Sequence, residues 1–345
     1  MTGTAHPLEL SREQILAHRR RAGALDARLA RTDDAVHRAA WAGLTDSTPR
    51  AAVLSLHARM SGTTAADWEH PALVQVWGPR FSAYAVHRDD VEVFTLSRWP
   101  ADAARQRYAV DLADRLDAFL DGREIRYGEA GRALDVHPNQ LRYATTTGRV
   151  LIRWDGARQP TVRMAPPPGI GHGEARAELL RRYLHVLGPG TADGFGEWAG
   201  LRASSARPAL AGLAGEMVPV RTPVGDGWIL AADEPSFRAA PDAPDAVRLL
   251  PSGDAYYLLQ GRERELLVPG AEHRPLLWTS RVWPGAVVVG GDVVGTWRRA
   301  DRTVAVSPWQ PMRPAVRAAV EAEAASLPVP GADSGMRVRW QDAAA

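Results

Sequence analysis

A short polar loop is the first place where this sequence could do chemistry. Thr45, Asp46 and Ser47 set one carboxylate between two hydroxyls, in a stretch that joins two expected helices. In a groove that excludes water, a carboxylate could hold a water molecule or stabilise a developing positive charge. The alternative is structural, because Ser47 or Thr48 could cap the helix that opens at Pro49, where the helix dipole also favours a carboxylate. We take Asp46 as the catalytic candidate, with Thr45 and Ser47 beside it.

Arginines are concentrated in one segment of the chain. Five arginines and a single acid lie between residues 142 and 163. The planar guanidinium group binds phosphate oxygens two at a time, and a cluster of one sign repels itself unless a polyanion lies close. We therefore expect this segment to bind a nucleic-acid backbone. The expected phosphate-binding residues on its hairpin are Arg149, Arg153, Arg158 and Arg163.

Three polar residues open the helix that precedes this hairpin. Asn139, Gln140 and Arg142 carry amide and guanidinium groups that could reach base edges or phosphates of DNA. The alternative for each of them is a solvated helix face. The hairpin arginines are the stronger candidates, because they act as a group.

The composition of the 345-residue chain excludes several other kinds of chemistry. It has no cysteine, which removes disulfides, thiolate metal sites and thiol nucleophiles. All 42 basic residues are arginine, so a lysine Schiff base and a Walker A phosphate loop are also excluded. The ten histidines include no pair four residues apart, so we expect no metal site and no cofactor. A formal net charge of +2 does not by itself identify a nucleic-acid binder.

The elements that position these residues follow a repeated plan of helices and then a two-stranded ribbon, which is the outline of a winged helix. Helical periodicity predicts helices over 8–31, 33–44 and 49–60, with strands over 73–77 and 82–86. A second set has helices over 107–120 and 127–134, a turn at 135–138, a helix from residue 139 and a hairpin over 149–164 that turns at Asp155-Gly156. A third set has helices over 174–187, 191–201 and 204–213 and a hairpin over 217–231.

A C-terminal β-rich region follows the third set. Strands are expected over 247–250, 255–259, 265–268, 286–289, 292–297 and 303–308, and a helix over 314–327. The expected fold class is therefore α+β. Its domains are tandem winged helices over 1–100, 101–170 and 171–240, a C-terminal domain over 245–330 and a loose tail over 331–345.

The chain resembles the AlkZ-like and YcaQ-like bacterial DNA glycosylases, a family of winged-helix DNA-binding proteins, over nearly its whole length. The resemblance rests on the order and spacing of six segments. They are 10–15 (LSREQI), 42–52 (AGLTDS, then PRAA), 73–80 (LVQVWGPR), 177–184 (AELLRRYL), 248–254 (RLLPSGD) and 294–299 (VGTWRR). The fold that the resemblance implies is a set of tandem winged helices in an open C shape with a C-terminal β-barrel-like domain.

Two motifs of this family are altered here. The family carries Gln-x-Gln or Gln-x-Asp after the second helix, and the corresponding positions read Thr45-Asp46-Ser47, so both catalytic side chains are missing from their usual places. A second element, Arg-Gly-Thr-x-His, reads Arg80-Phe-Ser-Ala-Tyr84, in which Arg80 is retained. The resemblance therefore adds Arg80 to the expected DNA-binding residues and leaves Asp46 as the catalytic candidate.

The resemblance implies excision of alkylated purines or the unhooking of crosslinks made by bacterial genotoxins, in DNA repair or genotoxin self-resistance. A purine alkylated at N7 or N3 is cationic and leaves without much help from a general acid, so the enzyme must stabilise the sugar cation and position a water. Since the chain has no lysine, a lysine-dependent lyase step is excluded, and we expect a monofunctional DNA glycosylase. The alternative is a non-catalytic winged-helix DNA-binding protein, either a transcription regulator or a lesion sensor. A small-molecule enzyme is a more distant alternative, because no cofactor loop is visible.

The expected partner is double-stranded DNA, alkylated or crosslinked, bound by a monomer. No run approaches the about 18 apolar residues of a membrane span, and residues 1–10 lack the pattern of a signal peptide. We therefore expect no membrane partner and a cytoplasmic, nucleoid-associated protein.

Overall fold

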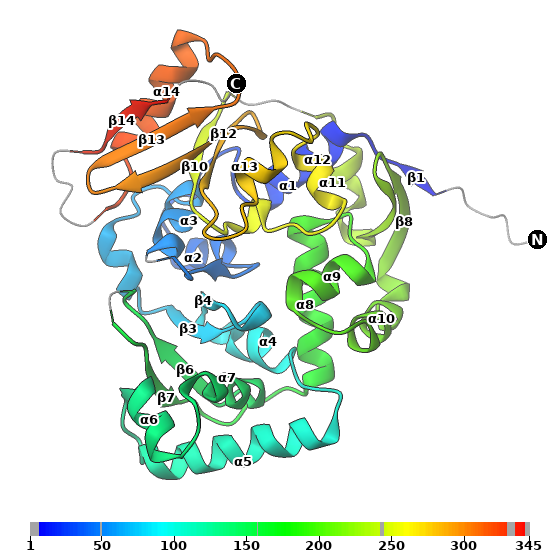
Figure 1. Cartoon of the computed structure of the whole chain (residues 1–345). Coiled ribbons are helices and arrows are strands. Elements are labelled where there is room, and N and C mark those ends of the chain that lie inside the picture. Colours follow the sequence, from blue (N-terminus) through cyan, green and yellow to red (C-terminus); the bar gives the residue numbers. More distant parts are fainter. Residues whose placement is uncertain (1–6, 49, 157, 242–244, 330–334, 342–345) are drawn as a thin grey trace, which may run out of the picture.

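The computed structural model describes residues 7–48, 50–156, 158–241, 245–329 and 335–341. Within this part of the chain the protein has a mixed α+β fold, in which helices surround three separate sheets (Figure 1). The α+β fold class is confirmed. None of the helices in these ranges is long and apolar enough to cross a membrane.

The N-terminal strand lies in the sheet of the third expected unit. β1 (Leu8–Glu9) pairs in parallel with β8 (Met217–Thr222), which pairs with β9 (Gly225–Leu230). The next helix, α1 (Arg12–Ala22), starts at a capping box in which the Ser11 hydroxyl accepts from the Gln14 amide. The expected helix over 8–31 is too long, because the backbone leaves the helical conformation at Gly23 and Ala24, where φ of Ala24 is 51°.

The two expected hairpins of the first and second units join into one six-stranded sheet. Gln75 of the first hairpin lies opposite Ile152 of the second, in an antiparallel pairing. The strands, in sheet order, are β2 (Leu44–Thr45), β4 (Ala83–His87), β3 (Leu73–Trp77), β6 (Val150–Arg153), β7 (Thr161–Met164) and β5 (Ile125–Arg126). This junction brings the polar loop of the first unit next to the arginine-rich hairpin of the second.

Helices cover these sheets and meet at a central helix, α8 (His172–Leu187). It packs against α1, β9, α4 (Val91–Leu96) and α10 (Ala203–Gly212), and its inner face is fully buried in the largest hydrophobic core. The other helices near the site are α2 (Asp33–Ala39), α3 (Ala51–Arg59), the 3-10 turns η1 (Ala65–Glu69) and η2 (Pro79–Phe81), α5 (Ala103–Leu120), α6 (Tyr127–Ala133), η4 (Pro138–Gln140), α7 (Leu141–Ala144) and α9 (Ala192–Ala199). The residue expected to open α3, Pro49, lies outside the described ranges.

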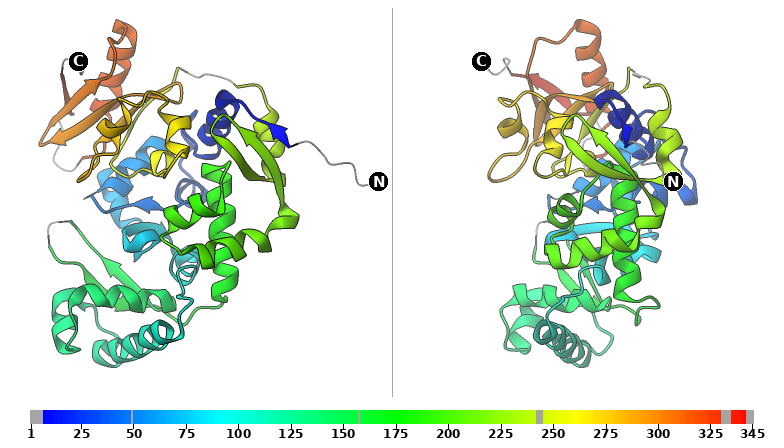
Figure 2. Two further views of the ribbon diagram at one scale, coloured as in Figure 1. Left: turned by 45° about the vertical axis from the view of Figure 1, so that its right-hand side comes forward. Right: turned by 90° about the vertical axis from the view of Figure 1, so that its right-hand side faces the viewer.

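The C-terminal region is an open sheet and not a closed barrel. Its order is β10 (Val247–Leu250), β11 (Gly285–Val289), β12 (Asp292–Ala300), β13 (Thr303–Pro308) and β14 (Arg337–Trp340), with β10 and β14 at the two edges. α14 (Pro314–Ala325) packs against both edge strands. The barrel-like form expected from the resemblance is therefore not confirmed. Figure 2 shows this sheet and the α5–α7 unit at opposite ends of the molecule.

Three expectations for the C-terminal region are wrong. The stretch 255–259 contains a 3-10 turn, η8 (Ala255–Tyr257), because the Asp254 carboxylate accepts from the Tyr256 amide and caps it. The stretch 265–268 lies mostly in α12 (Glu263–Leu267), since so short an apolar run does not distinguish a strand from a helix. The tail expected over 331–345 is not wholly loose, because β14 adds a parallel strand to β13 and packs Trp340 beneath Arg317.

A buried ion pair fastens α3 to the C-terminal region. The guanidinium of Arg59 donates to both Asp254 oxygens at 2.7 and 2.8 Å, and the Ser55 hydroxyl donates to the same carboxylate at 2.6 Å. The side chains of Arg59 and Asp254 are 4% and 0% exposed. Burial alone would raise the pKa of Asp254, but the charge and hydrogen bonds of Arg59 hold it below its usual value.

We predict that Asp254→Asn lowers the free energy of unfolding by about 3–5 kcal/mol, because it leaves a buried guanidinium without its counter-charge. The depressed pKa means that this stabilisation is present above the ordinary aspartate pKa and is lost as pH falls through the folded-state pKa. Urea unfolding of both proteins at pH 7 measures the loss. The control is Asp226→Asn in the exposed Arg221–Asp226 pair, for which a change below about 0.5 kcal/mol is expected.

Candidate functional site

The carboxylate of Asp46 is buried at the junction of three elements. Asp46 is 1% exposed. One oxygen accepts the Ala52 amide of α3 at 3.1 Å, and the other accepts the Gln75 amide of β3 at 2.5 Å and the Trp68 indole of η1 at 3.4 Å. Asp46 therefore binds an amide in the first turn of α3, six residues further along the chain, where the helix dipole was expected to favour a carboxylate. The cap expected from Ser47 or Thr48 is not formed, because the N-cap residue of α3 is Arg50, which makes no side-chain cap hydrogen bond. The loop residue exposed to solvent is Ser47.

Burial raises the pKa of Asp46 to about 6. The hydrogen bonds from Ala52, Gln75 and Trp68, together with the charge on Arg50, oppose that rise. The group is therefore mostly ionised at neutral pH, and its negative charge sits where solvent screening is weak.

Gln75 connects this carboxylate to the arginine-rich hairpin. Its amide nitrogen donates to Asp46 and also to the Trp154 carbonyl at 3.2 Å, and its amide oxygen accepts the Trp154 amide at 2.6 Å. Since Trp154 follows β6 directly, the base of the hairpin is held to the polar loop through a single buried side chain.

The indole of Trp68 stacks with two arginines. The guanidinium carbon of Arg50, in the loop before α3, lies 3.7 Å from the ring centroid, and that of Arg153 on the hairpin lies 4.7 Å away. Contacts of this kind contribute about 0.5–2 kcal/mol each. Arg153 also forms an exposed ion pair with Glu69. Trp68 therefore holds two positive charges near the polar loop, one from each side of the sheet junction.

Sequence reasoning missed Gln75, Trp68 and Arg50. A signal existed for Gln75, which is a polar residue inside the apolar strand LVQVW, and buried polar groups need partners. No periodic signal existed for Trp68 in a five-residue 3-10 turn, and only the tertiary structure places it beside Arg50.

The two altered family motifs meet in space. Thr45 and Tyr84 are cross-strand partners in β2 and β4, and both side chains are buried. Burial raises the pKa of Tyr84, and nearby Arg80 opposes the rise. Arg80 itself is half-buried in η2 with φ of 57°, against the C-terminal end of α9 at Gly200. The retained arginine is therefore half-buried beside α9, and the structure does not place it on the hairpin.

The hairpin arginines divide into paired and unpaired residues. Arg149 forms ion pairs with Asp114 and Asp117 of α5 at 2.5 and 2.8 Å, and Arg153 pairs with Glu69 of η1. The expectation of a cluster without acidic partners is therefore wrong for these two residues, because elements distant in sequence supply the acids. Arg158 and Arg163 are exposed, and neither has an ion-pair partner among the described residues.

The three polar residues before the hairpin do not share one environment. Asn139 and Gln140 are exposed, and their amide oxygens accept the hydroxyls of Tyr127 and Tyr108. Arg142 is half-buried, with its guanidinium carbon 5.9 Å from the ring of Trp77. The described helical stretch therefore presents the two amides to solvent and turns the arginine towards the core.

Folding brings together two sets of possible metal ligands that the spacing of histidines did not reveal. In each set the ligand atoms lie within 4.8 Å of one another; the sets are His18, His185 and Asp233, and His37, His87 and Asp90. Both ring nitrogens of His18 already have partners, the Ser236 hydroxyl and the His185 carbonyl. Asp90 is bound by Arg182, whose charge opposes a cation there. We assign no metal to either set.

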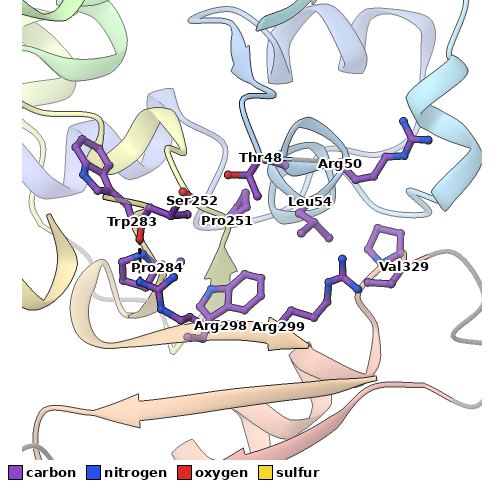
Figure 3. Close-up of a pocket in the computed structure, with 15 residues that line it drawn as sticks. Thr48, Arg50, Leu54, Pro251, Ser252, Trp283, Pro284, Arg298, Arg299 and Val329 are labelled. Carbon is purple, nitrogen blue, oxygen red and sulfur yellow. Dashed lines mark hydrogen bonds between the residues drawn. The ribbon is translucent and has the colours of Figure 1, made fainter. Parts of the chain in front are cut away.

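A pocket of about 250 Å³ lies between the polar loop and the C-terminal sheet (Figure 3). Thr48, Arg50 and Leu54 form the side contributed by the loop and α3. Arg298 and Arg299 of β12 form the opposite side. The pocket is thus a concave feature next to the loop that carries the altered motif. A second pocket, of about 100 Å³, lies on the hairpin side of the loop and is lined by Trp68, Gln75 and Arg153.

We predict that the stability difference between the wild type and Asp46→Asn depends on pH. Because the folded-state pKa is raised from 3.8 to about 6, the contribution of this group is full below the ordinary aspartate pKa and is lost as pH rises through about 6. A shift of this size corresponds to about 3 kcal/mol between pH 4 and pH 7. Urea unfolding across that range should show the wild type losing stability relative to the variant, and a constant difference would contradict the assignment.

Comparisons with known proteins match this chain to one family. The family model described as "DNA glycosylase AlkZ-like" matches residues 39–328. An "Interstrand DNA cross-link repair glycosylase" from Streptomyces sahachiroi is 31% identical over 158 residues, which cover 45% of this chain and 42% of that relative, so the match spans less than half of its length. The solved structure of the Streptomyces sahachiroi DNA glycosylase AlkZ has a similar fold, with a TM-score of 0.75, 18% identity and coverage of 97% of this chain and 100% of the other. The expected resemblance is confirmed, and the chain belongs to the AlkZ-like DNA glycosylase family.

Proposed function

We propose that this protein is a monofunctional DNA glycosylase that excises alkylated or bulky-adduct purines from double-stranded DNA. The observation that carries the proposal is the family match over residues 39–328, which includes the polar loop and the arginine-rich hairpin. The relative's name, an interstrand cross-link repair glycosylase, supports a role in DNA repair, including resistance to a genotoxin. We propose a monomer that acts in the cytoplasm, at the nucleoid.

The proposed DNA-binding face centres on the hairpin β6–β7, acting as the wing of a winged helix. Arg158 and Arg163 are exposed without ion-pair partners in the described chain, so they are available for phosphates. Arg153 is exposed above Trp68 and extends the same positive surface towards the polar loop. Asn139 and Gln140 would offer amide N–H groups to bases or phosphates, since their oxygens are already engaged.

The chemistry requires little from the protein beyond electrostatics. An N7- or N3-alkylated purine leaves as a neutral base, so positive charge develops on the sugar and not on the leaving group. Asp46 supplies a fixed negative charge close to that point without touching the sugar, because its carboxylate is covered by three donors. Ser47 is the exposed hydroxyl of the loop and is the candidate to hold the attacking water, whereas the Thr45 side chain is buried.

A non-catalytic DNA-binding role is the second candidate. The observation that favours it is the burial of Asp46, which places the one carboxylate of the motif out of contact with any substrate. The two candidates share the same DNA-binding face and differ in base release, so a release assay separates them.

We predict base release from duplex DNA that carries N7-alkylpurines, made with a methylating agent or with a bulky alkylating genotoxin. Strand breaks should appear after heat and alkali and not before them, because the chain has no lysine for a lyase step. Asp46→Asn should slow release about tenfold to a hundredfold, since the loss of a weakly screened charge near the sugar should cost about 1.4–2.8 kcal/mol. Asp226→Asn, which removes an exposed charge from the β8–β9 hairpin, is the matched control. Tight binding without release from either substrate would favour the second candidate.

The rate of base release should also depend on pH. Since the ionised form of Asp46 is the active one and its pKa is raised to about 6, the single-turnover rate should be constant above about pH 7 and fall as pH decreases through 6. Asp46→Asn should show no such step. If Asp46 acted only in folding, Asp46→Asn would lower the rate of base release but would leave its pH dependence unchanged. The rate of uncatalysed release is measured at each pH and subtracted, so that only enzymatic release is compared.

A further inference from the structure

We propose that the pocket between the polar loop and β12 binds a phosphate of the DNA strand, beside the nucleotide that the loop receives. The inference rests on the proposed function, which supplies the DNA, and it adds the C-terminal sheet to the DNA-binding surface. Thr48 lines the pocket and follows the exposed Ser47 directly in sequence, so a strand whose sugar lies at the loop would have a phosphate within reach of the pocket.

The positive charge of the pocket favours an anionic ligand. The lining contains three arginines, Arg50, Arg298 and Arg299, and no aspartate or glutamate. None of the three forms an ion pair within the described ranges, whereas Arg149 and Arg153 on the hairpin do. Each arginine of β12 uses one N–H group on a backbone carbonyl: Arg298 donates to Val282, and Arg299 donates to Asp301. Several charged donors therefore remain for a ligand.

The sheet leaves this side of β12 uncovered. β12 extends to Ala300, but its pairing with β11 ends where Trp297 lies opposite Gly285. Arg298 and Arg299 follow that point and are exposed, on a strand edge that β11 no longer covers. Figure 3 shows the two arginines on one side of the pocket and Thr48 and Leu54 on the other.

The same features argue against the damaged base as the occupant. An N7- or N3-alkylated purine carries a positive charge, which a pocket with three arginines and no carboxylate would repel. A phosphate gains from the guanidinium groups of Arg298 and Arg299 and from the hydroxyls of Thr48 and Ser252. The guanidinium of Arg50 points away from the pocket towards Trp68 and adds only its nearby positive charge (Figure 3). Trp283 and Pro284 supply apolar walls that lower the local dielectric and strengthen these contacts.

The pocket also continues the positive surface of the hairpin. Arg50 lines the pocket and stacks on Trp68, and Arg153 stacks on the same ring from the hairpin. A DNA backbone that crosses the hairpin would therefore stay next to positively charged side chains as it passes the loop and reaches the pocket.

The test measures binding of the full chain to an undamaged duplex as a function of salt. Arg298→Ala and Arg299→Ala should each weaken binding about tenfold, the loss of one charge-assisted contact. Each should also reduce the slope of log K against log salt by about 1. The matched control is Arg337→Ala, which removes an exposed arginine from the same sheet at β14, away from the pocket. Thermal melting of each variant confirms that these exposed substitutions leave the fold intact.

A second arm locates the phosphate. Duplexes with one neutral methylphosphonate at successive positions around a single N7-alkylpurine should bind the wild type less tightly when the neutral group occupies the pocket. At that position alone, the neutral group should not change the affinity of Arg299→Ala for the duplex. Equal effects of Arg299→Ala and Arg337→Ala, or equal sensitivity of wild type and variant at every position, would overturn the proposal while leaving glycosylase activity unaffected. A wild-type protein that binds no duplex overturns both proposals.

Discussion

The buried carboxylate of Asp46 is the interaction on which the arrangement of this site depends. It accepts hydrogen bonds from α3, from η1 and from β3, and through Gln75 it reaches the base of the arginine-rich hairpin. A carboxylate is suited to this position because its two oxygens can accept hydrogen bonds from three donors and the ionised group has no N–H or O–H of its own to satisfy. Burial of the charge is unfavourable, as the raised pKa shows, and the three donors and Arg50 offset part of that penalty. The loop therefore keeps its shape because one group satisfies several neighbours at once.

Arginine has two different structural roles in this chain, which has no lysine. A buried and a half-buried arginine fasten the C-terminal region to the N-terminal part of the chain through paired hydrogen bonds to a carboxylate. Arg59 does so with Asp254, and Arg28 donates to both oxygens of Glu323 at 2.7 and 2.8 Å. Arg158 and Arg163 on the hairpin and Arg298 and Arg299 on β12 are exposed, form no ion pair within the described ranges and define the positive surface. The planar fork of the side chain suits both roles, since carboxylates and phosphates present the same pair of oxygens.

Local pattern predicted most elements near the site. Residues 73–77 form a strand as the alternation predicted, and Asp155-Gly156 lies between the strands of a hairpin, because turn chemistry and alternation act over a few residues. The pattern failed for 255–259 and 265–268, where apolar runs of four or five residues fit a strand and a helix equally well. The local pattern also failed to predict β14. This strand is stabilised by hydrogen bonds to β13, which lies some 30 residues earlier in the chain.

The sequence by itself determined the candidates: a carboxylate between hydroxyls, arginines without lysine, and the order of segments that identifies the family. Residue types and local spacing are sufficient for these conclusions. The tertiary structure alone decided which candidates act together, because pairing between β3 and β6 sets Gln75 against the hairpin, and acids of α5 neutralise Arg149. It also decided that Asp46 faces inward and that arginines of β12 face the loop, some 250 residues away in the chain. Burial and charge pairing depend on which residues are neighbours in space, and local sequence patterns do not specify contacts between residues far apart in the chain.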